Sequence, residues 1–398
     1  MLKGKNVLLG ITGSIAAYKI ANLTSMLKKQ NCDVNVVMTK NAQEFIKPLV
    51  FETLTKNKCY VDTFERAAKF DVEHISIAQA ADLVLIAPAS ANVIAKLACG
   101  IADDMLTTTV LASKAPKLIA PAMNTAMYEN PVTQRNLETL KELGWHIIEP
   151  ASGLLACGDE GAGKMHEPEV LADHIMWHLA MEKDMAGKKV IVTAGPTQEA
   201  IDPVRYITNH SSGKMGYALA EVAMLRGADV VLVSGQTSLE PPRFVKVIDV
   251  TSTQSMYEAV LSEFEDADYV FKAAAVSDYT PSVTYDEKVK KKDGDMSIPL
   301  KRTPDILMEL GRQKKEGQFL CGFSMETQDL IKNSSVKLEK KNADMIIANN
   351  LKDAGSGFKT DTNMITLITK QEVRQLPLMS KFDVARSIID EVLKVQNM

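Results

Sequence analysis

The chain has 398 residues, of which 46% are hydrophobic and 24% are charged, and its formal net charge is −4. This length exceeds one ordinary hydrophobic core and predicts two domains, and the composition excludes long disordered or collagen-like stretches. The 46 basic and 50 acidic residues nearly balance, which argues against a nucleic-acid partner, and the five Cys contain no CxxC pair, which argues against a disulfide framework or a structural zinc site.

The first half alternates predicted strands and helices. Strands are predicted over 6–9, 34–38, 83–87, 118–120 and 145–148, and helices after the turn at Gly13 and over 92–98, 104–113 and 131–143. Apolar runs as short as 83–87 fall far below the ~20 residues of a membrane-spanning helix. The N-terminus leads directly into the first strand, so we expect a cytoplasmic protein without a membrane partner.

The alternation restarts after a helix that ends near Met181. Strands are predicted over 190–193, 229–233, 269–273, 319–323 and 345–347, and helices after the 211–216 turn and over 253–264, 329–341 and 381–395. We therefore predict an α/β protein of two doubly wound, Rossmann-like domains with mainly parallel sheets. The predicted domains span residues 1–181 and 189–398, and the polar stretch 182–188 is predicted to link them.

The turn Gly13-Ser14 stands between the first strand and the first helix. Backbone N–H groups at such a turn and at the helix N-terminus form an anion site. The turn is not GxGxxG, and no acidic residue stands about twenty positions later to hold a ribose, which disfavours a dinucleotide-dependent dehydrogenase. A mononucleotide phosphate such as that of FMN fits better, and a simple tight turn remains the alternative.

Small and polar residues follow two later strands, in Ala87-Pro88-Ala89-Ser90-Ala91-Asn92 and in Pro121-Ala122-Met123-Asn124. Small side chains at the carboxyl end of a strand allow a flat ligand to approach the backbone. The Asn124 amide suits a carboxylate, although an Asx turn or a helix cap is the simpler interpretation.

Two residues of the first half are candidates for proton transfer. His74 has an ordinary pKa near ~6.5, which suits transfer at neutral pH, although a lone His is more often a surface residue or a cap. The glycine-rich segment 151–165 predicts a mobile flap around Cys157, whose thiol, with an ordinary pKa near ~8.5, can donate a proton at pH 7. The other cysteines are expected to be incidental: Cys32, Cys59, Cys99 and Cys321.

Two segments of the second half suggest a phosphate ligand. Ser211-Ser212-Gly213-Lys214 at a helix start offers hydroxyls, N–H groups and a cation, but it lacks the P-loop spacing, and simple helix capping by the serines is the alternative. Asp278 follows a strand that ends in small residues, and Lys288-Val289-Lys290-Lys291-Lys292 forms a basic cluster. A basic loop beside an acidic strand end suits a nucleoside triphosphate with a metal, whereas a solvated loop is the simpler interpretation.

In order and spacing, Gly13–Lys19, His74, Pro121–Asn124 and the Cys157 segment resemble the flavin-dependent cysteine decarboxylases. With the second-half motifs, nearly the whole chain resembles the bifunctional phosphopantothenoylcysteine decarboxylase/phosphopantothenate–cysteine ligase family of coenzyme A biosynthesis. For the first half the resemblance implies FMN as cofactor, with contacts from Gly13, Ser14, Ser90 and Asn92. Ser14 stands where many members carry a second Gly.

The resemblance also implies the chemistry of the first half. FMN oxidises the cysteinyl thiol of the substrate to a thioaldehyde-like state, carbon dioxide leaves, and the enethiolate is then reduced and protonated. His74 is implied as the base or orienting group, Asn124 as the group that grips the carboxylate, and Cys157 as the acid of the reductive step. The family further suggests a homo-oligomer with flavin sites at subunit contacts.

For the second half the resemblance implies activation of 4'-phosphopantothenate by CTP as an acyl-cytidylate, which the amine of L-cysteine then attacks. Mg2+, with unknown ligands, would neutralise the triphosphate, and Asn209 would act at the acyl centre. The implied CTP contacts are Asp278, Lys288, Pro304, Asp305, Ile306, Leu307, Phe323, Lys337 and Lys341. The residues themselves leave CTP against ATP open, and a non-catalytic flavoprotein regulatory or binding module is the alternative function.

Overall fold

The computed structural model describes residues 1–64, 72–155, 158–290, 296–326, 328–350, 357 and 360–396. The chain divides into two compact units, Met1–Met181 and Glu182–Met398. Residues 182–188 belong to the second unit, where Met185 is buried and the Asp184 carboxylate accepts a 2.8 Å hydrogen bond from Arg226 Nε. No helix of the described ranges combines the length and the apolar character needed to cross a bilayer.

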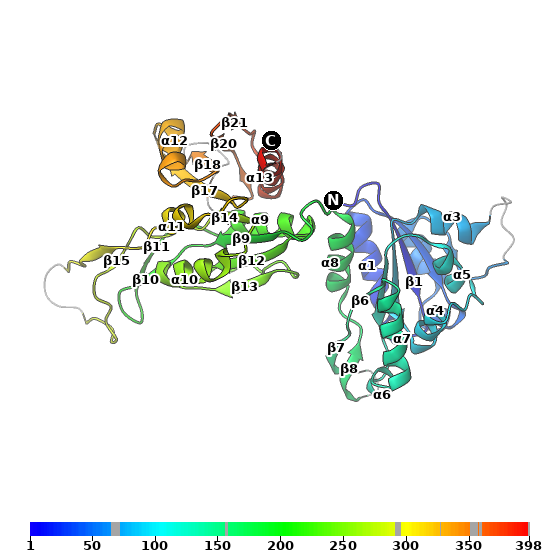
Figure 1. The fold of residues 1–398 in the computed structure, drawn as a ribbon. Coiled ribbons are helices and arrows are strands. Elements are labelled where there is room, and N and C mark those ends of the chain that lie inside the picture. The colour runs from blue at the N-terminus through cyan, green and yellow to red at the C-terminus, as the bar shows by residue number, and fades with distance from the viewer. Residues whose placement is uncertain are drawn as a thin grey trace. The chain divides into compact units, whose positions relative to one another are not determined.

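The first unit is built on a parallel sheet with the strand order β3-β2-β1-β4-β5-β6 (Figure 1). Its strands are β1 (Asn6–Ile11), β2 (Asp33–Met38), β3 (Cys59–Tyr60), β4 (Leu83–Ala89), β5 (Lys117–Pro121) and β6 (His146–Ile147). Because β1 lies between β2 and β4, the chain reverses its direction of winding there, and the carboxyl ends of β1 and β4 flank the topological switch point.

Helices cover both faces of this sheet. The face that carries Leu9 packs against α1 (Tyr18–Lys29), α2 (Pro48–Thr55) and α8 (Pro168–Leu179). The face that carries Leu8 packs against α3 (Glu73–Ala80), α4 (Ala91–Ala98), α5 (Met105–Ala112) and α7 (Pro131–Glu142). Burial on both faces explains why the strands are continuous apolar runs, and the predicted α/β class is confirmed.

The segment 151–165 forms an antiparallel hairpin of β7 (Ala151–Leu154) and β8 (Glu160–Lys164), where the sequence suggested an irregular flap. Glycines hide the strand pattern, because they leave no alternating side chains to recognise. Gly163 has φ +125°, and a Cβ there would lie 2.4 Å from the Met123 carbonyl oxygen. Glycine thus permits the hairpin to pack closely against the chain just before α6 (Thr125–Tyr128).

The second unit has a larger sheet with the order β13-β12-β9-β14-β17-β18-β20-β21. Its strands are β9 (Lys189–Ala194), β12 (Asp229–Ser234), β13 (Lys246–Asp249), β14 (Tyr269–Lys272), β17 (Phe319–Glu326), β18 (Met345–Asn350), β20 (Ile365–Thr369) and β21 (Val373–Gln375). The strands from β13 to β18 pair in parallel, and β20 pairs antiparallel with β18 and β21. The second switch point lies between β9 and β14.

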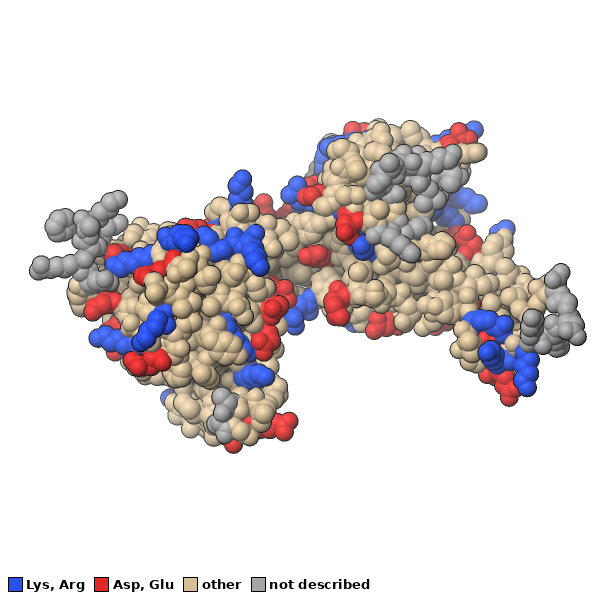
Figure 2. Space-filling model, turned by 180° about the vertical axis from the view of Figure 1, so that it is seen from behind, with Lys and Arg blue, Asp and Glu red and all other residues tan. Residues whose placement is uncertain are grey.

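Helices also cover both faces of the second sheet. α10 (Thr253–Phe264), α11 (Ile306–Gln313) and α12 (Leu330–Lys340) share one core with the sheet, and α9 (Lys214–Leu225) packs on β9 with α13 (Lys381–Gln396) against it. β10 (Gln198–Ala200) pairs with β11 (Tyr206–Thr208), and β15 (Tyr279–Pro281) pairs with β16 (Leu300–Arg302). β10, β11 and β15 extend away from the sheet as an arm (Figure 1). β19 (Thr362–Asn363) pairs with β22 (Met379–Ser380). On the face seen in Figure 2, basic and acidic side chains are interspersed over each unit.

Candidate functional sites

A cavity of about 480 Å³ lies at the carboxyl ends of β1 and β4 in the first unit. Its volume falls within the ~300–1,000 Å³ typical of small-molecule sites. Four predicted residues line it together: Gly13, Ser14, Ser90 and Asn124. Most of the remaining wall is apolar and comes from Ile15, Ala16, Ala91, Ala122, Met123, Met127, Leu154, Leu155 and Met165.

One buried hydroxyl joins the two loops at this switch point. Thr12 Oγ1 donates to the Pro88 carbonyl oxygen at 2.7 Å and accepts from the Ser90 N–H at 2.9 Å. Thr12 follows β1, Pro88 lies near the end of β4 and Ser90 is the N-cap of α4, so the hydroxyl fixes the Gly13-Ser14 turn relative to the start of α4. No sequence pattern indicated this contact.

The residues of the first-unit cavity fit FMN. Ser14 Oγ accepts from the Ala16 N–H at 3.3 Å and caps the short helix Ile15–Ala17, and Ser90 Oγ accepts from the Val93 N–H at 3.4 Å and caps α4. Two helix N-termini at one cavity favour a phosphate, and the apolar wall favours a flat ring system. Gly13 is required sterically, because a Cβ there would lie 2.8 Å from the Asn41 Cβ.

Asn124 is a helix cap, which is the simpler of the two interpretations of this residue. Its Oδ1 accepts from the Ala126 N–H at 2.9 Å, so Asn124 caps α6. Asn124 also lines the cavity, and its Nδ2 donates to Asp159 Oδ2 of the hairpin at 2.7 Å. The cap fixes the orientation of the amide, which leaves Nδ2 as the group directed at a carboxylate.

The structure does not bring every predicted first-unit residue to the cavity. His74 is half-buried in the first turn of α3, and Asn92 is exposed in the first turn of α4; neither lines the cavity. Cys157 lies outside the described residues.

Lys19 is a cavity residue that the sequence did not indicate. Its side chain is buried on α1, and its Nζ donates to Glu167 Oε1 at 2.7 Å and to the Met165 carbonyl oxygen at 3.2 Å. The hydrogen bond from Lys19 lowers the pKa of the Glu167 carboxyl group. Lys19 thereby ties the end of the hairpin to the helix that follows the Gly13-Ser14 turn. A lysine next to buried Ile20 on α1 was the only hint.

The second unit has a cavity of about 470 Å³ at its own switch point. It is lined by the predicted residues Asn209, Asp278, Phe323 and Lys337 and by the turn 211–216 that precedes α9. Gly213 begins this helix with φ +79° and has no side chain to cap the first-turn N–H groups. A Cβ at Gly216 would lie 2.6 Å from the Ala194 Cβ, so glycine lets α9 start directly against the end of β9.

A set of short hydrogen bonds fixes the loop that follows β14. Asn209 Nδ2 donates to the Ala275 carbonyl oxygen at 3.0 Å. The Ser277 N–H donates to Thr197 Oγ1 at 3.1 Å, and Thr303 Oγ1 donates to the Ser277 carbonyl oxygen at 2.6 Å. The Asn209 amide and the loop that carries Asp278 are thus held in a fixed relation before any ligand binds.

Several lysines surround this cavity. Lys337 Nζ donates to the Phe323 carbonyl oxygen at 2.7 Å, and Lys214 Nζ lies 2.6 Å from Asp361 Oδ1. Lys272 and Lys381 also line the cavity, and burial lowers the pKa of each to about 8. Sequence patterns did not single out Lys272 or Lys381, because each stands at the end of an otherwise ordinary element.

Other predicted second-unit residues lie outside the cavity. Ile306 and Leu307 are 2% and 3% exposed and belong to the hydrophobic core, so only their backbone is available to a ligand. Pro304 does not line the cavity, and Asp305 forms an ion pair with Lys341.

Lys288 is exposed on the arm, next to a segment that is held firmly. The Val289 N–H donates to Asp202 Oδ2 at 3.1 Å, and Arg205 donates to the Val289 carbonyl oxygen at 2.7 Å. Arg205 also pairs with Asp202, and that hydrogen bond lowers the pKa of the Asp202 carboxyl group. Lys291 and Lys292 lie outside the described residues.

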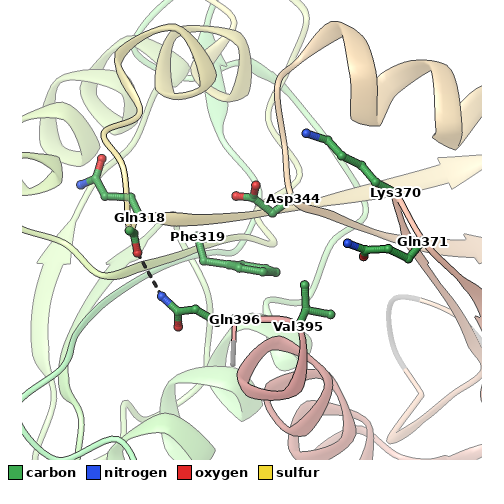
Figure 3. A pocket seen from close by; sticks show the side chains of 8 residues that line it. Gln318, Phe319, Asp344, Lys370, Gln371, Val395 and Gln396 are labelled. Carbon is green, nitrogen blue, oxygen red and sulfur yellow. Dashed lines mark hydrogen bonds between the residues drawn. The ribbon is translucent and has the colours of Figure 1, made fainter. Parts of the chain in front are cut away.

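A further pocket, of about 290 Å³, lies at the amino ends of β17 and β18 (Figure 3). Asp344 in its wall already accepts from Lys314 Nζ at 2.7 Å and from the Leu320 N–H at 2.8 Å. Open α/β sheets bind ligands at the opposite edge, so we assign no site here. Within the described ranges, no three His, Cys, Asp or Glu side chains are grouped to hold a metal ion.

Both halves of the chain match known families. A family model described as Flavoprotein matches residues 1–179, and one described as DNA/pantothenate metabolism flavoprotein C-terminal domain matches residues 185–395. The coenzyme A biosynthesis bifunctional protein CoaBC of Bacillus subtilis (strain 168) is 50% identical over 396 residues, which cover 98% of this chain and 97% of that protein.

Two solved structures each match one half. The C-terminal domain of a coenzyme A biosynthesis bifunctional protein CoaBC is 43% identical and covers 54% of this chain and 98% of its own, with a TM-score of 0.47. A PPC decarboxylase mutant complexed with pantothenoylaminoethenethiol is 36% identical and covers 43% of this chain and 96% of its own, with a TM-score of 0.40.

Proposed function

The chain belongs to the family of bifunctional coenzyme A biosynthesis proteins, and we propose that its units catalyse two consecutive steps. The second unit joins 4'-phosphopantothenate to L-cysteine with CTP, through an acyl-cytidylate. The first unit then decarboxylates 4'-phosphopantothenoylcysteine to 4'-phosphopantetheine with FMN. The observation that carries this proposal is the pair of cavities, one at each switch point, in a chain that matches the family from end to end.

In the ligase unit, Asn209 is the group that acts at the acyl centre. Its amide is held by the Ala275 carbonyl oxygen, and its second N–H is available to the carboxylate of 4'-phosphopantothenate and to the negative charge that develops when the cysteine amine attacks. Lys337 and the first-turn N–H groups of α9 suit the phosphates, and Phe323 suits the nucleoside.

We propose that Mg2+ enters the ligase cavity with the triphosphate. Mg2+ is commonly held by one or two carboxylates together with substrate phosphates rather than by a cluster of protein ligands. The described residues of this cavity fit that pattern, since Asp278 is a single carboxylate on the wall. Asp278 is therefore the residue that would share the ion with the phosphates.

In the decarboxylase unit, the Gly13-Ser14 turn and Ser90 would hold the phosphate end of FMN, and Ala122 and Met123 would pack against its ring. When bound, FMN supplies two-electron redox chemistry at the cysteinyl thiol. The Asn124 amide would hold the substrate carboxylate in place until carbon dioxide leaves. Asn92, exposed on the first turn of α4, would contact FMN from the rim.

His74 and Cys157 complete the proposed decarboxylase site. Because His74 does not line the cavity of its own copy, we propose that it reaches the cavity of a neighbouring copy in a homo-oligomer. There it would act as the base or orienting group at the substrate. Cys157 would donate the proton in the reductive step.

One incubation tests both activities. The protein, reconstituted with FMN, is mixed with 4'-phosphopantothenate, L-cysteine, CTP and Mg2+, and the products are identified by mass. We expect pyrophosphate, carbon dioxide and 4'-phosphopantetheine. Pyrophosphate release without carbon dioxide would remove the decarboxylase assignment. A yellow protein that releases neither would favour the non-catalytic flavoprotein module.

A further inference from the structure

Lys272 is the last residue of β14, and its side chain lines the ligase cavity. Among the residues that the structure describes, its ammonium group forms neither a hydrogen bond nor an ion pair. The other lysines of the cavity differ in this respect: Lys214 pairs with Asp361, and Lys337 donates to the Phe323 carbonyl oxygen. Lys272 is therefore a cation at the cavity wall that makes no direct contact with a counter-charge among the described residues.

The surroundings of Lys272 make this arrangement unfavourable without a ligand. Burial, and then the positive charge of Lys337, lower the pKa of Lys272 to about 8, while Asp305 and Asp278 act in the opposite direction. At neutral pH the group is still mainly protonated, so a poorly solvated positive charge is retained. Buried charges in proteins are normally paired, which indicates that the missing partner is an anion that enters with the ligand.

We propose that Lys272 binds the phosphate chain of the nucleoside triphosphate in the ligase cavity, a proposal that rests on the proposed ligase function. The charged groups that act on Lys272 are Lys337, Lys341, Asp278 and Asp305. All four are residues for which CTP contacts were expected, whereas the acyl centre was assigned to Asn209. A triphosphate is also the substrate group with the highest negative charge, and several lysines converge on this wall of the cavity.

Inorganic pyrophosphate is the probe that tests this proposal, because its binding does not depend on catalysis. Its affinity for the full-length, FMN-loaded protein is measured by calorimetry for the wild type, Lys272→Met, Lys272→Arg and the control Lys370→Met. Loss of one hydrogen bond between charged groups weakens binding roughly 10- to 100-fold, and we expect this for Lys272→Met. Lys272→Arg should retain most of the affinity, and Lys370→Met, in the pocket of Figure 3, should match the wild type.

The same variants give a second, independent measurement. Without ligand, Lys272→Met should melt at a higher temperature than the wild type, because the substitution removes an unpaired charge. A lower melting temperature would indicate that Lys272 has a structural partner and would overturn the proposal, as would a pyrophosphate affinity of Lys272→Met within about twofold of the wild type.

Failure of the ligase assignment has a different signature. If the wild type binds pyrophosphate through Lys272 but releases none from CTP and 4'-phosphopantothenate, the proposed ligase function is wrong and the assignment of Lys272 as an anion-binding residue stands. If pyrophosphate is released normally by both the wild type and Lys272→Met, with equal KM values for CTP, the ligase function stands and the role of Lys272 is wrong.

Discussion

Asn124 Nδ2 donates a 2.7 Å hydrogen bond to Asp159 Oδ2, so a carboxylate of the hairpin occupies the amide that we assign to the carboxylate of the substrate. The amide has a second N–H group, but two carboxylates at one amide would repel each other. If Asn124 holds the substrate carboxylate as proposed, we expect the substrate to displace Asp159, which would couple the hairpin to the arrival of its ligand.

Weakening this contact should favour substrate binding. In Asp159→Asn the acceptor loses its charge, and we expect the KM for 4'-phosphopantothenoylcysteine to fall roughly 3- to 10-fold, because hydrogen bonds to charged groups exceed neutral ones by about that factor. Carbon dioxide release at varied substrate concentration measures it. Glu160→Gln, a neighbouring exposed acidic position, is the control, and equal KM values for the two variants would refute the competition.

His74 and Asn124 should complement each other between copies. His74→Asn and Asn124→Ala are expected to be inactive separately. When the two variants are co-expressed with different tags and purified as mixed oligomers, at least about a quarter of the sites should combine both wild-type residues if subunits mix at random. Carbon dioxide release well above that of either variant is the expected outcome, and activity no higher than the single variants would refute a shared site.

Replacing the proposed acid should uncouple the two halves of the decarboxylation. Cys157→Ser should still release carbon dioxide but stall before reduction, because a serine hydroxyl is a far weaker acid than a thiol. Mass spectrometry should then detect the decarboxylated enethiol in place of 4'-phosphopantetheine. Cys99→Ser, at an exposed cysteine, should behave as the wild type. Normal formation of 4'-phosphopantetheine by Cys157→Ser would exclude the acid role.

The arm should contribute to nucleotide activation through Lys288. Lys288→Gln is expected to slow pyrophosphate release roughly 10- to 100-fold, the usual effect of losing one charged hydrogen bond. Asp202→Asn should have a smaller effect in the same direction, because Asp202 holds the neighbouring Val289 N–H. Lys301→Gln, on β16, which pairs with β15 of the arm, is the control. An unchanged rate in Lys288→Gln would show that the arm is not involved.

Lys272 should leave a signature in the pH dependence of stability. Its pKa is about 8 in the folded protein against an ordinary 10.5, so between these values the unfolded chain binds more protons and stability rises with pH. The destabilising contribution is complete below pH ~8 and is relieved towards pH ~10.5. At roughly 1.4 kcal/mol per pKa unit, the gain is at most about 3.5 kcal/mol.

The free energy of unfolding of the wild type and of Lys272→Met, measured by denaturant titration from pH 7 to pH 10, tests this linkage. The two proteins should differ most at pH 7 and converge as the pH rises. A constant difference across this range would mean that the folded and unfolded pKa values of Lys272 are equal.

Two features of the fold could be predicted from the sequence: the buried parallel strands, and the residues that meet at the carboxyl ends of those strands. Parallel strands buried on both faces are continuous apolar runs, so β4 and β14 were recognised without long-range information. The residues that follow such strands must meet at one edge of the sheet. This is why Gly13, Ser90 and Asn124, which are distant in sequence, were expected at one cavity and line it together.

The remaining features depend on contacts between side chains, which sequence spacing does not encode. Lys341 was expected to contact CTP, yet its side chain forms an ion pair with Asp305 and does not line the cavity. The hairpin around Gly163 was hidden because its glycines serve a close backbone approach rather than a side-chain pattern. Lys19 and Lys272 line the cavities, but nothing in the neighbouring sequence distinguishes them from lysines on the surface.

The Thr12 hydroxyl forms hydrogen bonds with the backbone of Pro88 and Ser90 and thereby preorganises the cavity of the first unit. The two loops cannot separate without breaking both hydrogen bonds, so their spacing is already set when a nucleotide arrives. Little conformational entropy is then lost on association, and the affinity for the nucleotide benefits directly. A valine at position 12 would have nearly the same shape but could form neither hydrogen bond, so the two loops would no longer be held at a fixed distance.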